Sequence, residues 1–413
     1  MNDFYKIYDI VAEVKTPIFV GSGEKLLKKD YYVDEKENKI YVVDVNKLIR
    51  RNNKILSLYE EYVKDINKTF NEWIKDSSIR LYLNEEIIKK ELTIYTIDRG
   101  NADIRGGAKQ INTNRKDYNT TDIEKFIKNP YNKVYLPGSS IKGAIRLAML
   151  SSSILNETDS ENLDYNIKQI EGVIKSFSDR SIKGFNSKNI EKQYFNKLQR
   201  NKENPNEAVN DIFSYISVSD SEPIDINSLV LCEKIDIYID KYKNRKEKKL
   251  KLIRETLKPK VEIKFRINIQ NDKNGFQMDE ILEKIKTHSK HYLEYYNKNF
   301  KLQLTNYNGI YLPIGGGVGY ISKTIVDDVG ASLNTMNATK IKGVNSQNIG
   351  AYYISQILGK IFSRHNHYYD YKTYGFAPRL EKSTKYDNQL VPMGLLEIKK
   401  IFEPKTSKYI LNI

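Results

Sequence analysis

The segment from Tyr135 to Leu150, YLPGSSIKGAIRLAML, joins an extended run, a tight turn and an amphipathic helix. Pro137 and Gly138 end the extended run, because proline fixes φ and glycine frees it. Ser139 or Ser140 is then expected to cap the helix by accepting an early backbone N–H. The apolar residues that follow recur at helical spacing and form one stripe: Ile141, Ala144, Ile145, Ala148 and Met149. The segment therefore predicts a strand, a turn and a helix with one buried face.

The same helix carries two cations close to its start. Lys142 and Arg146 lie four residues apart on a face that does not overlap the apolar stripe. Unpaired N–H groups at a helix N-terminus favour an anion. The segment thus fits a phosphate cradle made by Ser139, Ser140, Lys142 and Arg146. It fits an ordinary strand-to-helix turn with two solvated cations equally well, and spacing alone does not choose between them.

The net charge of the chain indicates the kind of partner that it binds. The 413 residues contain 68 Lys and Arg against 53 Asp and Glu, a formal net charge of +15, which suits an anionic partner such as nucleic acid. No apolar run approaches the ~20 residues of a membrane-spanning helix, and the N-terminus MNDFYKIYDI does not read as a secretion signal. The single cysteine, Cys232, excludes an internal disulfide and a cysteine metal cluster. We expect a cytoplasmic protein with no membrane contact, metal or cofactor.

Two further segments are rich in glycine. An alternating strand over residues 4–14 leads into Gly21, Ser22 and Gly23, with Lys25 close behind. Residues 311–324, YLPIGGGVGYISKT, predict an exposed loop in which backbone is accessible. That loop matches neither the dinucleotide fingerprint nor the P-loop. Its glycines are Gly315, Gly316, Gly317 and Gly319.

Three basic segments lie elsewhere. Residues 99–134 lack apolar periodicity and read as an extended basic arm, or alternatively as a disordered insertion. Residues 241–260 hold ten cations and two anions, and such charge runs are usually solvated, so we predict a solvated connection rather than a nucleic-acid contact. A C-terminal loop carries Arg379, Lys382 and Lys385 ahead of a final strand.

The order of predicted elements indicates an α+β fold with two ferredoxin-like domains of the split βαβ type. The first spans residues 1–213 and contains the arm at 99–134 and helical material at 151–212. The second spans residues 214–413 and contains the glycine-rich loop at 313–319.

Three motifs together resemble a known family. They are GSG at 21–23, LPGSSIKGAIR at 136–146 and SVSDS at 217–221. The pattern resembles the RAMP superfamily of CRISPR effector complexes. The chain length and the loop LPIGGGVG at 312–319 narrow the resemblance to the subunit that caps the backbone filament of type III-A complexes.

The resemblance implies a non-catalytic, RNA-binding role near the 3′ end of the CRISPR guide RNA (crRNA). It implies partners in the crRNA, in target RNA, in the backbone subunits of the same complex and in cellular nucleases recruited for guide maturation. The residues that it assigns to RNA are Gly21, Ser22, Gly23, Lys25, Lys109, Arg115, Ser139, Ser140, Lys142, Arg146, Gly315, Gly316, Gly317, Gly319, Arg379 and Lys382.

Other functions are open at this stage. A guide-processing endoribonuclease of the same superfamily would use a histidine as general acid or base, and the chain offers His288 with His291, and His365 with His367. A target-cutting subunit would use an acidic residue, for which Asp30 is the nearest candidate. A single-strand RNA-binding protein outside any complex is also compatible with the charge.

Overall fold

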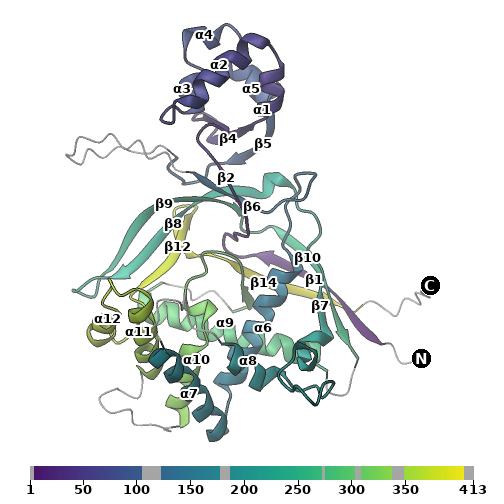
Figure 1. The fold of residues 1–413 in the computed structure, drawn as a ribbon, viewed down its shortest axis with the longest axis vertical. Coiled ribbons are helices and arrows are strands. Elements are labelled where there is room, and N and C mark those ends of the chain that lie inside the picture. Colours follow the sequence, from purple (N-terminus) through teal and green to yellow (C-terminus); the bar gives the residue numbers. More distant parts are fainter. Residues whose placement is uncertain are drawn as a thin grey trace.

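The computed structural model describes residues 4–104, 122–176, 187–271, 275–302, 308–336 and 348–403. Within these ranges the chain builds two curled β-sheets with helices packed against them, as Figure 1 shows. This is the α+β class that the sequence predicts. None of the described helices is long and apolar enough to cross a membrane.

The first sheet places the first strand of the chain at its centre. Its strands, in order across the sheet, are β11 (Ile310–Pro313), β14 (Leu395–Phe402), β1 (Tyr5–Val14), β10 (Glu262–Gln270) and β7 (Ile216–Val218). All neighbouring strands in it are antiparallel. The predicted alternation in the first strand is confirmed, because every second residue from Tyr8 to Val14 is buried.

The second sheet is larger. Its main path runs through β2 (Gly21–Leu26), β6 (Ile123–Phe126), β9 (Arg245–Leu257), β8 (Leu229–Ile239), β5 (Thr93–Asp98), β4 (Lys39–Val43) and β3 (Tyr31–Asp34). At the other end of β8, β12 (Leu380–Tyr386) pairs with it, and β13 (Gln389–Pro392) pairs with β12. The prediction of a connection at 241–260 was wrong, because most of that run is strand β9, antiparallel to β8. Long-range pairing with an apolar strand overrides the local charge.

Helices pack below both sheets in the view of Figure 1. They are α6 (Gly138–Leu155), α7 (Ser160–Ser176), α8 (Lys188–Phe195), α9 (Met278–Phe300), α10 (Val326–Met336), α11 (Ile349–Ile361) and α12 (His367–Tyr374). Short 3₁₀ turns lie at Ala208–Asn210, Ile212–Tyr215, Ile226–Ser228 and Ile321–Lys323. The predicted apolar stripe of α6 is confirmed, since Ile141, Ile145 and Met149 are buried in the main core.

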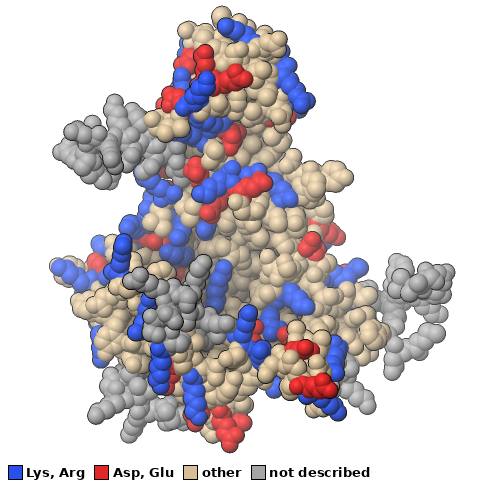
Figure 2. Space-filling view, viewed as in Figure 1, with Lys and Arg blue, Asp and Glu red and all other residues tan. Residues whose placement is uncertain are grey.

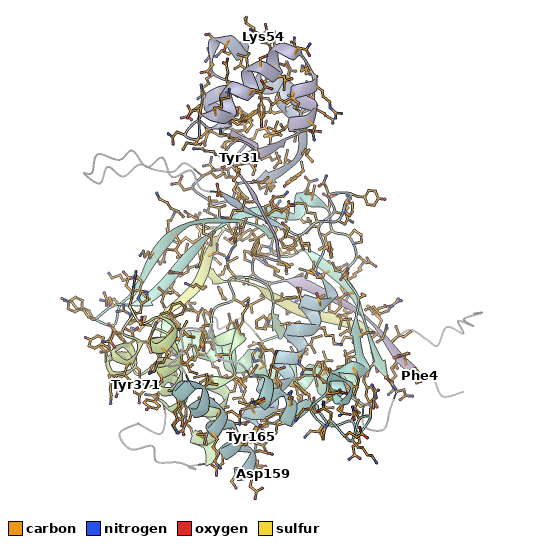
Figure 3. All side chains as sticks on the ribbon, viewed as in Figure 1. Phe4, Tyr31, Lys54, Asp159, Tyr165 and Tyr371 are labelled. Atoms are coloured by element: carbon orange, nitrogen blue, oxygen red, sulfur yellow. The ribbon has the colours of Figure 1, made fainter. Side chains whose placement is uncertain are left out.

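A small helical subdomain stands on β3, β4 and β5 at the top of Figure 1. Its helices are α1 (Val45–Arg50), α2 (Asn53–Lys64), α3 (Phe70–Trp73), α4 (Ser77–Arg80) and α5 (Glu85–Glu91). It has its own hydrophobic core, in which Tyr62 stacks on Trp73 with ring centroids 4.6 Å apart. Figure 3 places Tyr31 at its base and Lys54 at its outer end. The subdomain is thus packed independently of the main core.

Both sheets combine strands from the two predicted halves of the chain. In the first sheet β1 lies between β10 and β14, and in the second β6 lies beside β9. The boundary at residue 213 therefore does not coincide with a boundary between sheets, and the division into two domains stays a prediction. Of the arm at 99–134, residues 105–121 lie outside the described residues.

Candidate nucleic-acid interface

Helix α6 begins at Gly138, and a carboxylate from a distant part of the chain caps it. The Gly138 N–H donates to Asp220 Oδ1 at 2.7 Å, across 82 residues of sequence. A Cβ on Gly138 would lie 2.3 Å from the Val218 carbonyl oxygen, so this approach requires glycine. No side chain at the helix start makes the capping bond. The prediction that Ser139 or Ser140 caps the helix was wrong, because Asp220 supplies the acceptor.

Some side chains in the first turns of α6 are exposed to solvent, and others contact the rest of the protein. Ser139 is exposed and Ser140 is half-buried. Lys142 Nζ donates to the Ile216 carbonyl oxygen at 2.6 Å, at the start of β7. Burial lowers the pKa of Lys142, and the nearby Asp211 carboxylate opposes this shift. Lys142 therefore holds β7 against the helix, and its contact with RNA stays a prediction, as does that of both serines.

Arg146 is surrounded by groups of the protein itself. Its Nε lies 3.1 Å from Glu191 Oε2 and its Nη1 lies 2.7 Å from Asp211 Oδ2. Its guanidinium carbon lies 4.5 Å from the ring centroid of Phe195 and 4.9 Å from that of Phe213. Two carboxylates and two aromatic rings thus use the guanidinium to join α6 and α8. A phosphate contact by Arg146 stays a prediction.

The glycine-rich loop at 315–319 packs against the residues that directly precede Gly21. The Gly316 N–H donates to the Phe19 carbonyl oxygen at 2.7 Å, and a Cβ on Gly315 would lie only 2.1 Å from the same oxygen. We call this contact of residues 17–21 with residues 315–319 the glycine junction. The prediction of an exposed glycine loop was wrong, because the loop packs on residues 17–21. The half-buried glycines are Gly315, Gly316, Gly317 and Gly319.

The segment that follows residue 20 is open to solvent. Every residue of β2 from Gly21 to Lys25 is exposed, Ser22 included. No atom lies within 4 Å of the position that a Cβ on Gly23 would take. Lys25 Nζ lies 3.9 Å from Asp122 Oδ2, an exposed pairing that contributes little to stability. These positions are accessible to an external ligand at an edge of the second sheet, and RNA contact by them stays a prediction.

Arg254 of β9 lies at the glycine junction and was missed from the sequence. Its guanidinium carbon lies 4.8 Å from the Phe19 ring centroid, and its Nε donates to Glu124 Oε2 at 2.7 Å. Its Nη1 is buried without a hydrogen-bond partner among the described residues, next to Gly317. Only its place in the basic run at 241–260 pointed to it, and that run was interpreted as a solvated connection.

The remaining predicted RNA contacts are scattered. Arg379 Nε lies 3.4 Å from Asp370 Oδ1, and Lys382 Nζ lies 2.8 Å from Asp236 Oδ1 on β8. Both side chains are about one-third exposed, at 38% and 30%. Lys109 and Arg115 lie outside the described residues.

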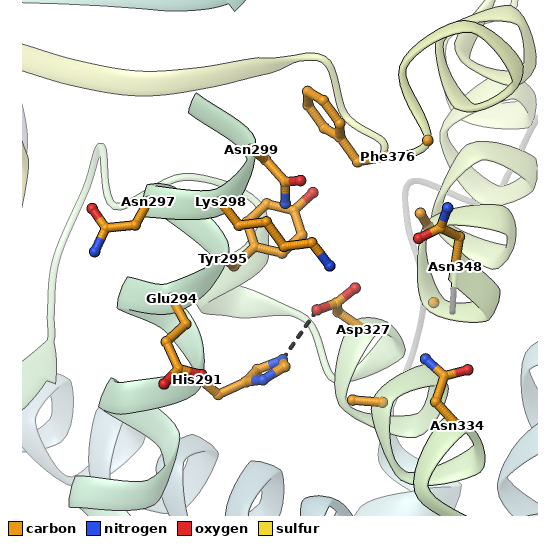
Figure 4. Close-up of a pocket in the computed structure, with 14 residues that line it drawn as sticks. His291, Glu294, Tyr295, Asn297, Lys298, Asn299, Asp327, Asn334, Asn348 and Phe376 are labelled. Atoms are coloured by element: carbon orange, nitrogen blue, oxygen red, sulfur yellow. Dashed lines mark hydrogen bonds and ion pairs between the residues drawn. The ribbon is translucent and has the colours of Figure 1, made fainter. Parts of the chain in front are cut away.

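Of the two histidines of α9, His291 borders a pocket of about 500 Å³ between α9 and the helices from α10 onward, drawn in Figure 4. Burial alone disfavours the charged form of His291, but its hydrogen bond to Asp327 Oδ2 (3.0 Å) and the charge of Asp328 raise its pKa to about 9. His288 is buried against Ser151 Oγ at 2.8 Å, and burial lowers its pKa to about 3. Around neutral pH the two histidines therefore hold opposite, fixed protonation states, which does not suit a shuttled proton.

The second histidine pair, His365 and His367, lies at the start of α12. The rings of His365 and His367 have centroids 5.9 Å apart, and burial lowers the pKa of His367. Throughout the described ranges, no group of three His, Cys, Asp or Glu side chains is arranged to hold a metal ion. That the chain has no catalytic activity stays a prediction.

The burial of His288 predicts a dependence of stability on pH. Because its folded-state pKa of about 3 lies below the unfolded value of 6.5, only the unfolded state gains this proton as the pH falls below about 6.5. Each further pH unit then lowers the free energy of unfolding by up to about 1.4 kcal/mol. Between neutral pH and pH 4.5, we expect the free energy of unfolding of the natural chain to fall by on the order of 2 kcal/mol more than that of His288→Gln. Urea unfolding at both pH values measures this, and His365→Gln, at an exposed position, serves as the control. Equal losses in all three proteins would contradict it.

Comparison with known proteins identifies the family of the chain. A family model of the RAMP superfamily matches residues 11–320, so the chain belongs to the RAMP superfamily. Within it, the chain is 25% identical over 420 aligned residues to the CRISPR system Cms protein Csm5 of Mycobacterium tuberculosis, an alignment that covers 96% of this chain and 98% of that protein. Csm5 of Enterococcus italicus is 25% identical over 324 residues, which cover 76% of this chain and 72% of that protein. The resemblance to the RAMP superfamily and to a subunit of type III-A complexes is confirmed, and the place of the chain as filament cap stays a prediction.

Solved structures show the same fold. A chain in the cryo-EM structure of a Csm–crRNA–target RNA ternary complex of a type III-A CRISPR–Cas system is similar with a TM-score of 0.56 and 18% identity, covering 95% of this chain and 100% of that one. The crystal structure of T. onnurineus Csm5 also gives a TM-score of 0.56, with 17% identity, covering 94% of this chain and 100% of that one.

Proposed function

We propose that this chain is a non-catalytic crRNA-binding subunit of a type III-A Csm complex, and that it caps the backbone filament near the 3′ end of the guide. The observation that carries the proposal is the glycine junction, where Arg254 lies beside closely packed backbone and the exposed residues of β2 follow directly. Similarity to Csm5 proteins along almost the whole chain supports it. Two ferredoxin-like domains belong to the same proposal.

The chemistry at the junction suits an RNA backbone rather than a base sequence. Exposed N–H groups of β2, the Ser22 hydroxyl and nearby cations can all contact phosphate and sugar, which carry no direct sequence information. A subunit that accepts any guide needs this kind of contact. Its partners in the proposal are the crRNA, target RNA, the neighbouring backbone subunits and nucleases that trim the guide.

Binding of single-stranded RNA tests this function. We expect the purified chain to bind fluorescein-labelled oligouridine and oligoadenosine with similar affinity. The slope of log K against log salt concentration is expected to lie between about −2 and −4, since each phosphate contact on a single strand contributes about −0.7. Fluorescence anisotropy over a salt series measures both. A flat salt series, or strong discrimination between the two sequences, would count against backbone recognition.

Assembly tests the remaining part of the proposal. We expect a tagged copy of the chain to co-purify with the other Csm subunits and crRNA from cells that express the whole complex. Recovery of the chain with RNA alone would favour a stand-alone RNA-binding protein instead.

A further inference from the structure

The β8–β9 hairpin has two faces that differ in how their charges are paired, because successive residues of a strand point to opposite sides. On one face, Lys385 of β12 pairs with Glu247 at 2.7 Å, and Lys249 pairs with Glu233 at 3.0 Å. Each of these cations is matched by a carboxylate. The same face also carries Lys251 and Arg245, whose guanidinium donates to the Lys301 carbonyl oxygen.

The other face has more cations than carboxylates. Lys248 of β9 and Lys382 of β12 lie opposite Asp236 of β8 from its two sides. Asp236 pairs with Lys382 at 2.8 Å, whereas Lys248 has no carboxylate partner in the described part of the chain. Lys246 lies 4.0 Å from Asp240, at the limit of an ion pair. With Lys234, these residues form what we call the cationic face: Lys234, Lys246, Lys248 and Lys382.

The cationic face continues toward the glycine junction. Burial lowers the pKa of Lys234, and the positive charges of Lys382 and Arg254 lower it further against the opposing charge of Asp236, so Lys234 lies close enough to both cations to be repelled by them. Desolvation and the charge of Arg254 likewise lower the pKa of Lys323, just beyond the glycine loop. Cations held this close are stabilised by an anionic ligand.

The cations also follow a line along the molecule. From Arg254 to Lys246 the strand extends for about 25 Å at the usual rise per residue. The outer residues of β9, Arg245–Lys249, are all exposed. In Figure 2, Lys and Arg side chains gather on the left of the body, where Figure 1 places β8, β9 and β12. The line of cations thus begins at the glycine junction and ends near the hairpin turn.

We propose that single-stranded RNA leaves the glycine junction and follows the cationic face of β8, β9 and β12, with its phosphates on Lys234, Lys248 and Lys246. This rests on the proposed function, because it extends the path of an RNA bound at the junction. An RNA backbone suits the surface better than a protein, since lysine is depleted in protein–protein interfaces. Phosphate recognition, in contrast, needs only a row of cations.

A matched pair of double variants tests the path. Lys246→Gln with Lys248→Gln removes two charges from the cationic face, and Arg245→Gln with Lys249→Gln removes two charges from the opposite face of the same exposed strand segment. With an oligouridine of about 30 nucleotides, we expect the first variant to bind at least about fivefold more weakly, with its salt slope reduced by about 1.4 for two lost phosphate contacts. The second variant is expected to stay within twofold of the natural chain. Lys246→Arg with Lys248→Arg is expected to restore binding.

Each outcome decides between the proposals. Equal weakening by both variants, or no weakening by the first, would overturn the RNA path while leaving RNA binding at the junction intact. Failure of the natural chain to bind RNA would overturn the path and the proposed function together. If the first variant binds RNA normally but no longer co-purifies with the backbone subunits, the face contacts protein and the RNA path is wrong. Circular dichroism spectra and urea midpoints equal to those of the natural chain establish that the variants are folded.

Discussion

Gly315→Ala is expected to lower the free energy of unfolding by about 3 kcal/mol or more. Gly315 has a φ of +86°, and a Cβ there would lie 2.1 Å from the Phe19 carbonyl oxygen, a backbone atom. Left-handed backbone at a residue other than glycine costs about 1–3 kcal/mol, and overpacking adds about 1–3 kcal/mol. Relief of the clash would separate the loop from residues 17–21 and break the bond from the Gly316 N–H to the Phe19 carbonyl oxygen. RNA affinity is therefore expected to fall together with stability.

Urea unfolding followed by far-ultraviolet circular dichroism measures the loss of stability. Fluorescence of Trp73, the only tryptophan, reports instead on the separate core of the small subdomain. Gly359→Ala is the matched control, because no atom lies within 4 Å of the added methyl group and the residue is helical. If the Gly315→Ala protein is as stable as the Gly359→Ala protein, the glycine junction accommodates the added methyl group without loss of stability. Position 315 then does not require glycine.

The elements that the sequence predicts well are those with a strong local pattern. The alternation in β1 and the apolar stripe of α6 are confirmed at nearly the predicted bounds. In these segments the period of the apolar residues and the geometry of the element agree.

The features that were missed depend on partners far apart in the chain. The cap of α6 comes from Asp220, and strand β9 forms because β8 lies beside it. Local propensity favours a serine cap and a solvated run at these places, and tertiary contacts override it. Arg254 belongs to the same class, since only pairing in the second sheet brings it to Phe19.

The candidate site shows the same division. The glycine-rich segments could be located from composition, but their contact could not, because close packing of loop backbone leaves no periodic pattern. The family motif gave the positions of Lys142 and Arg146 without their environment. Both turn inward in the structure, to a carbonyl oxygen and to two carboxylates. Their role is therefore best decided by experiment.

Arg146→Ala is expected to lower the free energy of unfolding by about 2 kcal/mol. It leaves Glu191 and Asp211 without their shared cation and removes the contacts with Phe195 and Phe213. Loss of one partner from a fully buried ion pair costs about 3–5 kcal/mol. The side chains here are about one-quarter exposed, so solvent screening reduces the effect. Urea unfolding measures it, with Lys168→Ala on the exposed face of α7 as the control, expected within about 0.5 kcal/mol of the natural chain.

Comparison with Arg146→Lys separates a structural role from RNA binding. A lysine keeps the charge but cannot pair with two carboxylates while stacking between two rings, because it lacks the planar guanidinium. If Arg146 joins α6 to α8, both variants lose stability, and RNA affinity per folded molecule stays within about twofold of the natural value, since no phosphate contact is lost. If Arg146 instead binds phosphate directly, Arg146→Ala weakens RNA binding at unchanged stability and Arg146→Lys restores it. The contacts with Glu191 and Asp211 favour the first result, in which Arg146 joins α6 to α8.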